Sequence, residues 1–240
     1  MSFLMKKTVL MAGITALILA LPAYGSVNKS VKIADGAQSK GASSVNGSIT
    51  VGDHASVTGN LTTVNGAIRI GADSTIEDAS TVNGSLRISK NTKTEDLETV
   101  NGAIKIAEKV VVDGEVTAVN GQISLGNGSS VASHLSNVNG DISLTGSTVG
   151  RDVSTVNGDV SVMDGAVIKG DLSVEKPHGF NNSSRDSNKP TVIIGPGSRV
   201  EGKIILEREV KLFISESAQV GGVEGVMSMA DAVRFSGNRP

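Results

Sequence analysis

The sequence contains no cysteine and no tryptophan, and its aromatic residues are one tyrosine and four phenylalanines. The absence of cysteine excludes a disulfide-stabilised scaffold and a lipoprotein anchored through an acylated cysteine. A globular core normally contains large rings, so the shortage of aromatics indicates a narrow core of small branched side chains. Glycine, in contrast, accounts for 29 of the 240 residues; the small branched residues favour strands, and glycine favours the tight turns between them.

Long apolar runs are also missing, except at the N-terminus. Lys6 and Lys7 precede an apolar run over residues 8–21, and Ala23-Tyr24-Gly25 supplies small residues before Ser26. This order is typical of a secretory signal peptide over residues 1–25; the alternative is an uncleaved N-terminal anchor. We expect an exported protein, in the periplasm, at the cell surface or secreted, whose mature chain has no transmembrane span.

The charge balance has no basic excess. Without residues 1–25, which include two lysines, 20 basic residues face 24 acidic residues, and the formal charge is −4. Proteins that bind nucleic acid generally carry a clear excess of lysine and arginine. The composition therefore argues against a nucleic-acid partner.

The tripeptide Val-Asn-Gly occurs seven times at intervals of 18 or 19 residues, and Val27-Asn28-Lys29 is a degenerate copy 18 residues before the first. A fixed period of this length indicates a repeat architecture in which each unit stacks on the next. The asparagines of these copies are Asn28, Asn46, Asn65, Asn83, Asn101, Asn120, Asn139 and Asn157.

Each tripeptide is followed by an apolar–polar–apolar alternation, such as Ile68-Arg69-Ile70, which predicts a strand with one buried face. A second apolar pair surrounds a small turn, as in Val112-Asp-Gly-Glu-Val116. Each repeat thus has about three short strands and three corners, and it buries its apolar side chains only by stacking. We predict an all-β, three-sided β-solenoid over residues 26–223, with about ten coils and, at about 4.8 Å per coil, a length of about 45–50 Å.

Two segments depart from the repeat. Residues 176–190 are polar, rich in turn formers and bounded by prolines, which predicts a loop extruded from the asparagine corner. Loops on a rigid scaffold often carry recognition, so Phe180 and Arg185 are candidate contact residues. Residues 224–240 form either a cap over the end of the stack or a tail.

The corners Ile168-Lys-Gly-Asp-Leu172 and Val200-Glu-Gly-Lys-Ile204 resemble those of bactofilins, a polymer-forming cytoskeletal family. The tandem Val-Asn-Gly strands resemble bacterial adhesin-like β-solenoid families. This resemblance covers residues 27–225 and implies a triangular, right-handed β-helix without enzymatic activity. Bactofilins assemble end to end in the cytoplasm; the export signal, the looped-out corner and the C-terminal segment of this chain depart from that pattern.

The asparagine column is expected to be structural, because asparagine and glycine both tolerate left-handed backbone at a tight turn. Stacked one coil apart, the side-chain amides can bond to one another along the rod. If these amides are buried, replacing Asn101 by alanine should lower stability by about 1–3 kcal/mol.

Two charged columns are candidate binding features. Arg69, Arg87 and Lys105 occupy the exposed middle of successive strands, and we propose an anionic envelope polymer or lipid head group as their partner; the alternative is side chains splayed into solvent. A second column lies at the small turn and is interrupted by His134. It contains weak calcium candidates, for which a solvated corner is the alternative: Asp78, Asp96, Glu115, Asp152 and Asp171.

Catalytic patterns are lacking. His54, His134 and His178 lie in different parts of the repeat, and there is no serine elbow or phosphate loop. The strict rhythm of hexapeptide acyltransferases is absent, and the column Ser44, Thr63, Thr81 and Thr99 is too interrupted for an antifreeze face.

We therefore expect an exported, non-enzymatic structural or adhesin-like module, without cofactor or metal, that binds a repetitive envelope polymer, lipid head group or protein. The first alternative is a self-assembling scaffold that forms homo-oligomers through its ends. The second is a solenoid enzyme acting on polysaccharide.

Overall fold

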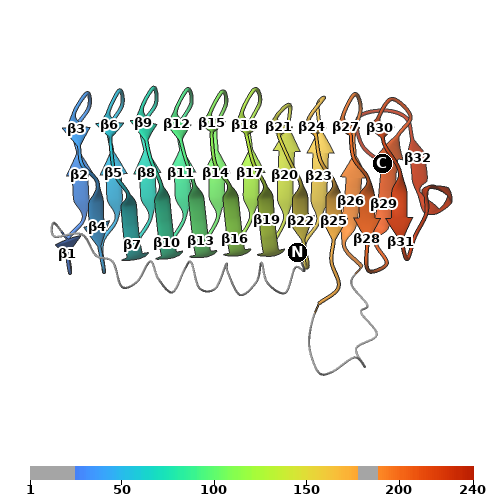
Figure 1. The fold of residues 1–240 in the computed structure, drawn as a ribbon, viewed down its shortest axis with the longest axis horizontal. Helices are drawn as coiled ribbons and strands as arrows, with labels where there is room; N and C mark the ends of the chain where they lie inside the picture. Colours follow the sequence, from blue (N-terminus) through green and yellow to red (C-terminus); the bar gives the residue numbers. More distant parts are fainter. Residues whose placement is uncertain (1–24, 178–188) are drawn as a thin grey trace.

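The computed structural model describes residues 25–177 and 189–240. These residues form a three-sided rod of three β-sheets, and the strands within each sheet are parallel (Figure 1). The chain adds one strand to each sheet in turn, so that each strand pairs with the strand three places further along the chain. Successive partners are 18 or 19 residues apart through the tandem repeats, as in Ile68↔Leu86 and Ile104↔Ile123. The predicted all-β, three-sided solenoid of about ten coils is confirmed.

The three sheets are named A, B and C. Sheet A consists of β1 (Gly25–Ser26), β4 (Ala42–Ser44), β7 (Leu61–Asn65), β10 (Ala79–Asn83), β13 (Leu97–Asn101), β16 (Val116–Asn120), β19 (Leu135–Asn139), β22 (Val153–Thr155), β25 (Leu172–Val174), β28 (Ile204–Leu206) and β31 (Val223–Gly225). Sheet B consists of β2 (Val31–Ile33), β5 (Ile49–Val51), β8 (Ile68–Ile70), β11 (Leu86–Ile88), β14 (Ile104–Ile106), β17 (Ile123–Leu125), β20 (Ile142–Thr145), β23 (Val160–Met163), β26 (Thr191–Ile194), β29 (Lys211–Ser215) and β32 (Val233–Phe235). Sheet C consists of β3 (Gln38–Ser39), β6 (Ser56–Val57), β9 (Thr75–Ile76), β12 (Lys93–Thr94), β15 (Val111–Val112), β18 (Ser130–Val131), β21 (Thr148–Val149), β24 (Val167–Ile168), β27 (Arg199–Val200) and β30 (Gln219–Val220).

The core runs along the axis of the rod as columns of identical or similar apolar side chains. In sheet B the first and third residues of each strand point inward, as in β14, where Ile104 is fully buried and Ile106 is 4 % exposed. The residue between them, Lys105, is exposed. Branched side chains fill this narrow interior without large rings, because each contacts its equivalent in the next coil.

The corner between sheets A and B, here called the A–B corner, contains the glycine of Val-Asn-Gly. The backbones of successive coils approach so closely at this position that only glycine fits. A Cβ on Gly84 would lie 1.9 Å from the carbonyl oxygen of Gly66, and a Cβ on Gly102 would lie 1.9 Å from that of Gly84. The backbones of these glycines stack directly on one another, so any side chain would clash with the backbone of the preceding coil.

Left-handed backbone lies mainly at a different corner. The expectation of left-handed backbone at the Val-Asn-Gly asparagines is wrong: in the described chain they do not have positive φ, although three of the following glycines, Gly121, Gly140 and Gly158, have φ of 130–157°. Residues with φ near +57° lie instead at the B–C corner, where β8 ends before Asp73 and β11 ends before Asn91, with φ of 56° and 57°. Short polar side chains and glycine occupy most of these positions because they tolerate this conformation.

The predicted loop lies between β25 and β26, at an A–B corner (Figure 1). Its central part, including Phe180, Arg185 and His178, lies outside the described residues, as does the predicted signal peptide up to residue 24. Both ends of the insertion are held by the following coil. The backbone N–H of Lys176 donates to the Glu207 carboxylate, 3.1 Å away, and Lys189 forms an ion pair with Glu209.

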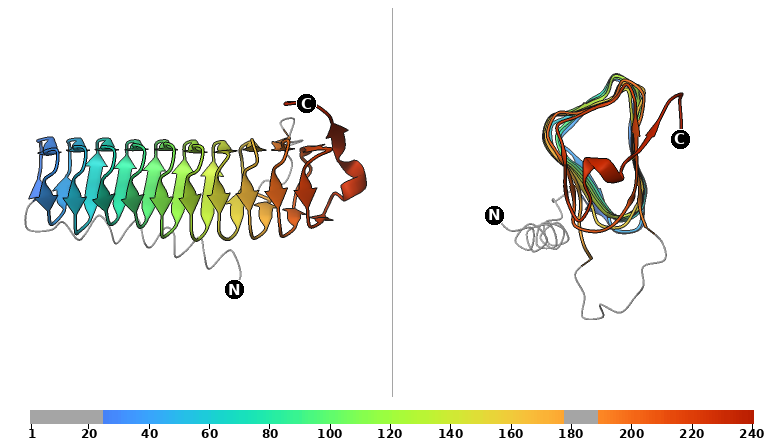
Figure 2. Two further views of the ribbon diagram at one scale, coloured as in Figure 1. Left: turned by 90° about the horizontal axis from the view of Figure 1, so that it is seen from above. Right: turned by 90° about the vertical axis from the view of Figure 1, so that its right-hand side faces the viewer.

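Residues 226–235 close the C-terminal end of the rod. The 3₁₀ helix η1 (Met229–Asp231) crosses the end of the cross-section, and the chain then returns as β32 alongside β29 (Figure 2). Met227 packs against the core, and its sulfur accepts a hydrogen bond from the Val210 N–H. No helix in the described part of the chain is long and apolar enough to cross a membrane.

Candidate ligand-binding face

The asparagine column forms a continuous ladder of hydrogen bonds along the A–B corner. Each side-chain Nδ2 donates to the Oδ1 of the asparagine one coil earlier, at 2.8–2.9 Å, from Asn46→Asn28 through Asn157→Asn139. The ladder ends where the insertion removes the next asparagine. At this position Arg208 Nη1 donates the hydrogen bond to Asn157 Oδ1, at 2.8 Å.

The asparagine ladder is exposed, which reduces the loss of stability expected when one of its amides is removed. Asn101 is exposed, so the assumption of buried amides is wrong. Water can therefore replace the hydrogen-bond partners that the substitution removes. We now expect Asn101→Ala to lower the free energy of unfolding by only about 0.5–1.5 kcal/mol. Urea denaturation measures this change, with Asn127→Ala, an exposed asparagine outside the ladder, as the matched control. A loss above about 3 kcal/mol would contradict the exposed geometry.

A second ladder lies inside the same corner. Thr63, Thr81 and Thr99 are buried, and each hydroxyl donates to a glycine carbonyl of the previous coil at 2.8–3.0 Å. The sequence shows this column but not the direction in which its side chains point. Its side chains point into the interior, so they cannot form an ice-binding or other external face.

Carboxylate oxygens of the acidic column form hydrogen bonds between successive coils. Asp78, Asp96, Asp152 and Asp171 each accept a hydrogen bond at Oδ1 from a backbone N–H of the next coil, at 2.7–3.2 Å. Within residues 25–177 and 189–240, no three histidine or acidic side chains gather as a metal site would need. These four aspartates are therefore a further set of bonds between coils, and the calcium candidates, Glu115 included, do not come together as a metal cage within the described residues.

The corner between sheets C and A is nonetheless acidic. Burial, together with the charges of Asp96, Asp78 and Glu115, raises the pKa of the Glu98 carboxyl. Burial is the larger cause of this shift, and the neighbouring carboxylates add to it by disfavouring a further negative charge.

The outer face of sheet B carries the three cations in register. Arg69 pairs with Arg87 and Arg87 with Lys105, so their Cα atoms lie on neighbouring strands. All three side chains are exposed, and none belongs to an ion pair within the described residues. We call Arg69, Arg87 and Lys105 the cationic stripe.

The outward column of sheet B continues beyond the stripe and changes character. Three serines follow Lys105, and three apolar residues follow the serines. We call this column the sheet B lane; in order its outward residues are Lys32, Thr50, Arg69, Arg87, Lys105, Ser124, Ser143, Ser161, Ile193, Phe213 and Val233. The register passes through the insertion without interruption, because Ser161 pairs directly with Ile193.

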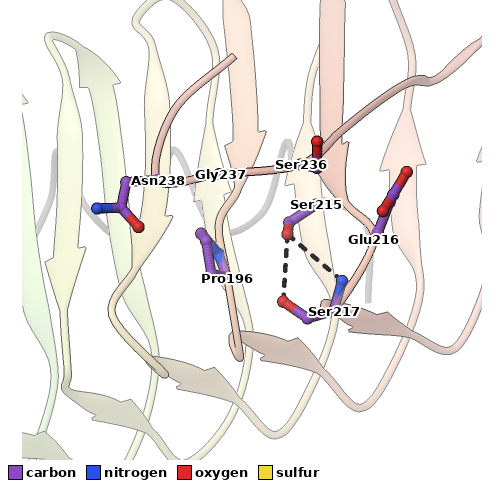
Figure 3. A pocket seen from close by; sticks show the side chains of 7 residues that line it. All are labelled: Pro196, Ser215, Glu216, Ser217, Ser236, Gly237 and Asn238. Carbon is purple, nitrogen blue, oxygen red and sulfur yellow. Dashed lines mark hydrogen bonds between the residues drawn. The ribbon is translucent and has the colours of Figure 1, made fainter.

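A small surface pocket lies near the C-terminal end of the rod (Figure 3). Its volume is about 280 Å³, and its lining residues are Pro196, Ser215, Glu216, Ser217, Ser236, Gly237 and Asn238. The Ser215 and Ser217 hydroxyls lie 3.3 Å apart, and Glu216 is the one titratable side chain in the lining. Histidine and lysine, the bases that usually activate a serine nucleophile, are not among the lining residues.

The chain was compared with known proteins at three levels. No protein-family model, curated protein or solved structure matches it.

Proposed function

We propose that this protein is an exported, non-enzymatic β-solenoid of the cell envelope that binds a repetitive anionic partner along the outer face of sheet B. The observation that carries the proposal is the cationic stripe. Three like charges stand on adjacent strands about 4.8 Å apart, and like charges directly opposite one another are unfavourable in a sheet. A row of phosphates or carboxylates would remove that repulsion.

The rod supplies what a polymer-binding site needs. Its backbone is fixed by three continuous sheets, so the cations are held in one line before the ligand arrives. The acidic C–A corner lies on a different edge of the cross-section from sheet B. This separation gives an anionic chain one preferred face and accelerates its approach at low salt.

Removing the stripe tests the proposal. We expect Arg69→Gln/Arg87→Gln/Lys105→Gln to weaken binding to polyglycerol phosphate at least about tenfold, since three exposed charge contacts contribute roughly 0.5–1 kcal/mol each. Isothermal titration at about 0.05 M salt measures the affinity, and the wild-type affinity should fall as salt rises and the Debye length shortens.

The control removes equal charge elsewhere. Lys40, Arg151 and Lys169 are exposed and lie near the C–A corner, and their combined replacement by glutamine should leave the affinity within about twofold. Equal losses in both triple variants would mean that net charge alone drives binding. No loss in the stripe variant would refute the proposed site.

A further inference from the structure

The sheet B lane has three chemically distinct parts in a single straight column, and the cationic stripe is only the first. The hydroxyl segment comprises Ser124, Ser143 and Ser161, and the apolar segment comprises Ile193, Phe213 and Val233. Figure 1 shows the strands that carry them side by side along the length of the rod. A ligand lying along this lane meets cations, then hydroxyls, then apolar side chains.

The anionic part of such a ligand is confined to the stripe. Beyond Lys105 the lane has no further cation, and Asp141 and Asp159 flank its hydroxyl segment, two residues before Ser143 and Ser161. Each carboxylate accepts a backbone N–H of the next coil, which holds a negative charge beside the lane. A polyanion extending past Lys105 would approach these two carboxylates, which favours an uncharged ligand along the hydroxyl segment; the next exposed cation in the flanking column is Lys211, beside the apolar segment.

The hydroxyl segment fits an uncharged, hydroxylated spacer. Its three side chains are short and half-buried, which leaves a smooth surface with donors and acceptors at each step. Lys105 and Ile193 are four strands apart, a separation of about 19 Å at about 4.8 Å per strand. A short oligosaccharide has that length and offers hydroxyl groups throughout.

The apolar segment is the unusual end of the lane. Phe213 and Ile193 are half-buried on the outer face, and the Val233 side chain is 55 % exposed. Val226 and Met229, in the cap at the same end of the rod, are 58 % and 40 % exposed. Ile193, Phe213 and Val233 lie on adjacent strands, and neighbouring apolar side chains on an outer face indicate a binding site for an apolar group.

We propose that the sheet B lane binds a lipid-anchored anionic glycan in one orientation. Its phosphates or carboxylates lie on the cationic stripe, its uncharged sugars cover the hydroxyl segment, and its acyl chains contact the apolar segment. This assignment rests on the proposed function, and it adds the acyl group and the direction of the ligand along the rod. The cationic stripe determines where the charged groups of the ligand lie, and the order of the three segments determines its direction along the rod.

Lipoteichoic acid, in which a glycolipid carries polyglycerol phosphate, is the probe, and its alkali-deacylated form is the matched ligand. Both are titrated below the critical micelle concentration against immobilised full-length protein. Wild-type protein should bind the acylated form at least tenfold more tightly. In Ile193→Ser/Phe213→Ser/Val233→Ser this preference should disappear while the affinity for the deacylated form stays within twofold. Val111→Ser, which removes an exposed valine from sheet C, should keep the preference.

The outcomes separate the two proposals. Equal affinity of wild-type protein for both forms would overturn the inference and leave the proposed function standing, whereas no binding of either form would refute both. Equally tight binding to phosphatidylglycerol vesicles would overturn the inference in favour of a plain lipid surface. Thermal unfolding of each variant establishes that it is folded. If the triple variant does not fold, Phe213→Ser alone replaces it, and this single variant should lose part of the preference for the acylated form.

Discussion

Replacing Gly102 by alanine is expected to destabilise the rod by at least about 3 kcal/mol, the upper range for overpacking. The new Cβ would lie 1.9 Å from the Gly84 carbonyl oxygen, 2.4 Å from its carbon and 3.1 Å from the Ser85 nitrogen. All three atoms are backbone atoms held by the sheets, so none can rotate away. The coil must shift, and with it the hydrogen bond from the Gly102 N–H to the Asn120 carbonyl. Urea denaturation gives the change in unfolding free energy.

Gly222 provides the matched control. A Cβ there would meet only the Lys203 side chain, 3.8 Å away, and the residue does not have left-handed φ. Gly222→Ala should therefore be neutral or slightly stabilising, since alanine restricts the unfolded chain. If Gly102→Ala were as stable as the wild type, the coils could not approach each other as closely as this corner requires.

Deleting one complete coil should leave the remaining rod folded. Removal of residues 84–101 joins Asn83 to Gly102 and restores Val-Asn-Gly at the junction. The inward columns, the asparagine ladder and the outward lane then continue in register with one step fewer. Because repeat proteins are stabilised by nearest-neighbour contacts, we expect cooperative unfolding at a modestly lower temperature and the same circular dichroism per residue.

A half-coil deletion is the contrasting control. Removal of residues 84–92 takes away β11 and the B–C corner, so that at the junction every strand would meet a strand of a different sheet one coil away. Loss of the register at this junction exposes buried side chains, and we expect no single cooperative transition. Equal folding of the two deletions would contradict a stack with one coil per repeat.

The strands could be predicted because their information is local. In Ile68-Arg69-Ile70 the alternation gives the buried face, and the constant period gives the partner of each residue one coil away. Stacked identical positions then require the same environment. The alternation and the period together therefore predicted a three-sided β-solenoid and the neighbours Arg69, Arg87 and Lys105.

The corners were harder to predict because Asn and Gly have several uses. Asn-Gly favours left-handed turns, but here Asn65 ends strand β7 and the glycine next to it permits backbone stacking. Likewise, the direction of Thr63 and the use of the Asp96 carboxylate depend on how the corner bends. Neither is encoded in the spacing of the residues.

The second half of the sheet B lane was also missed in the sequence. Ile193, Phe213 and Val233 follow the insertion, where no Val-Asn-Gly marks the frame of the repeat. Only the strand pairing Ser161↔Ile193 places them in the column of Arg69. The cationic stripe was therefore predictable, but its continuation into an apolar segment was not.

The most direct test of the account is to map the face that an anionic polymer covers. Amide NMR spectra of the isotope-labelled protein, titrated with polyglycerol phosphate, report the contact residue by residue. We predict shifts centred on Arg69, Arg87 and Lys105 and on the neighbouring strands of sheet B. Shifts confined to sheet C or to the C–A corner, or no shifts at all, would contradict the proposal that sheet B is the binding face.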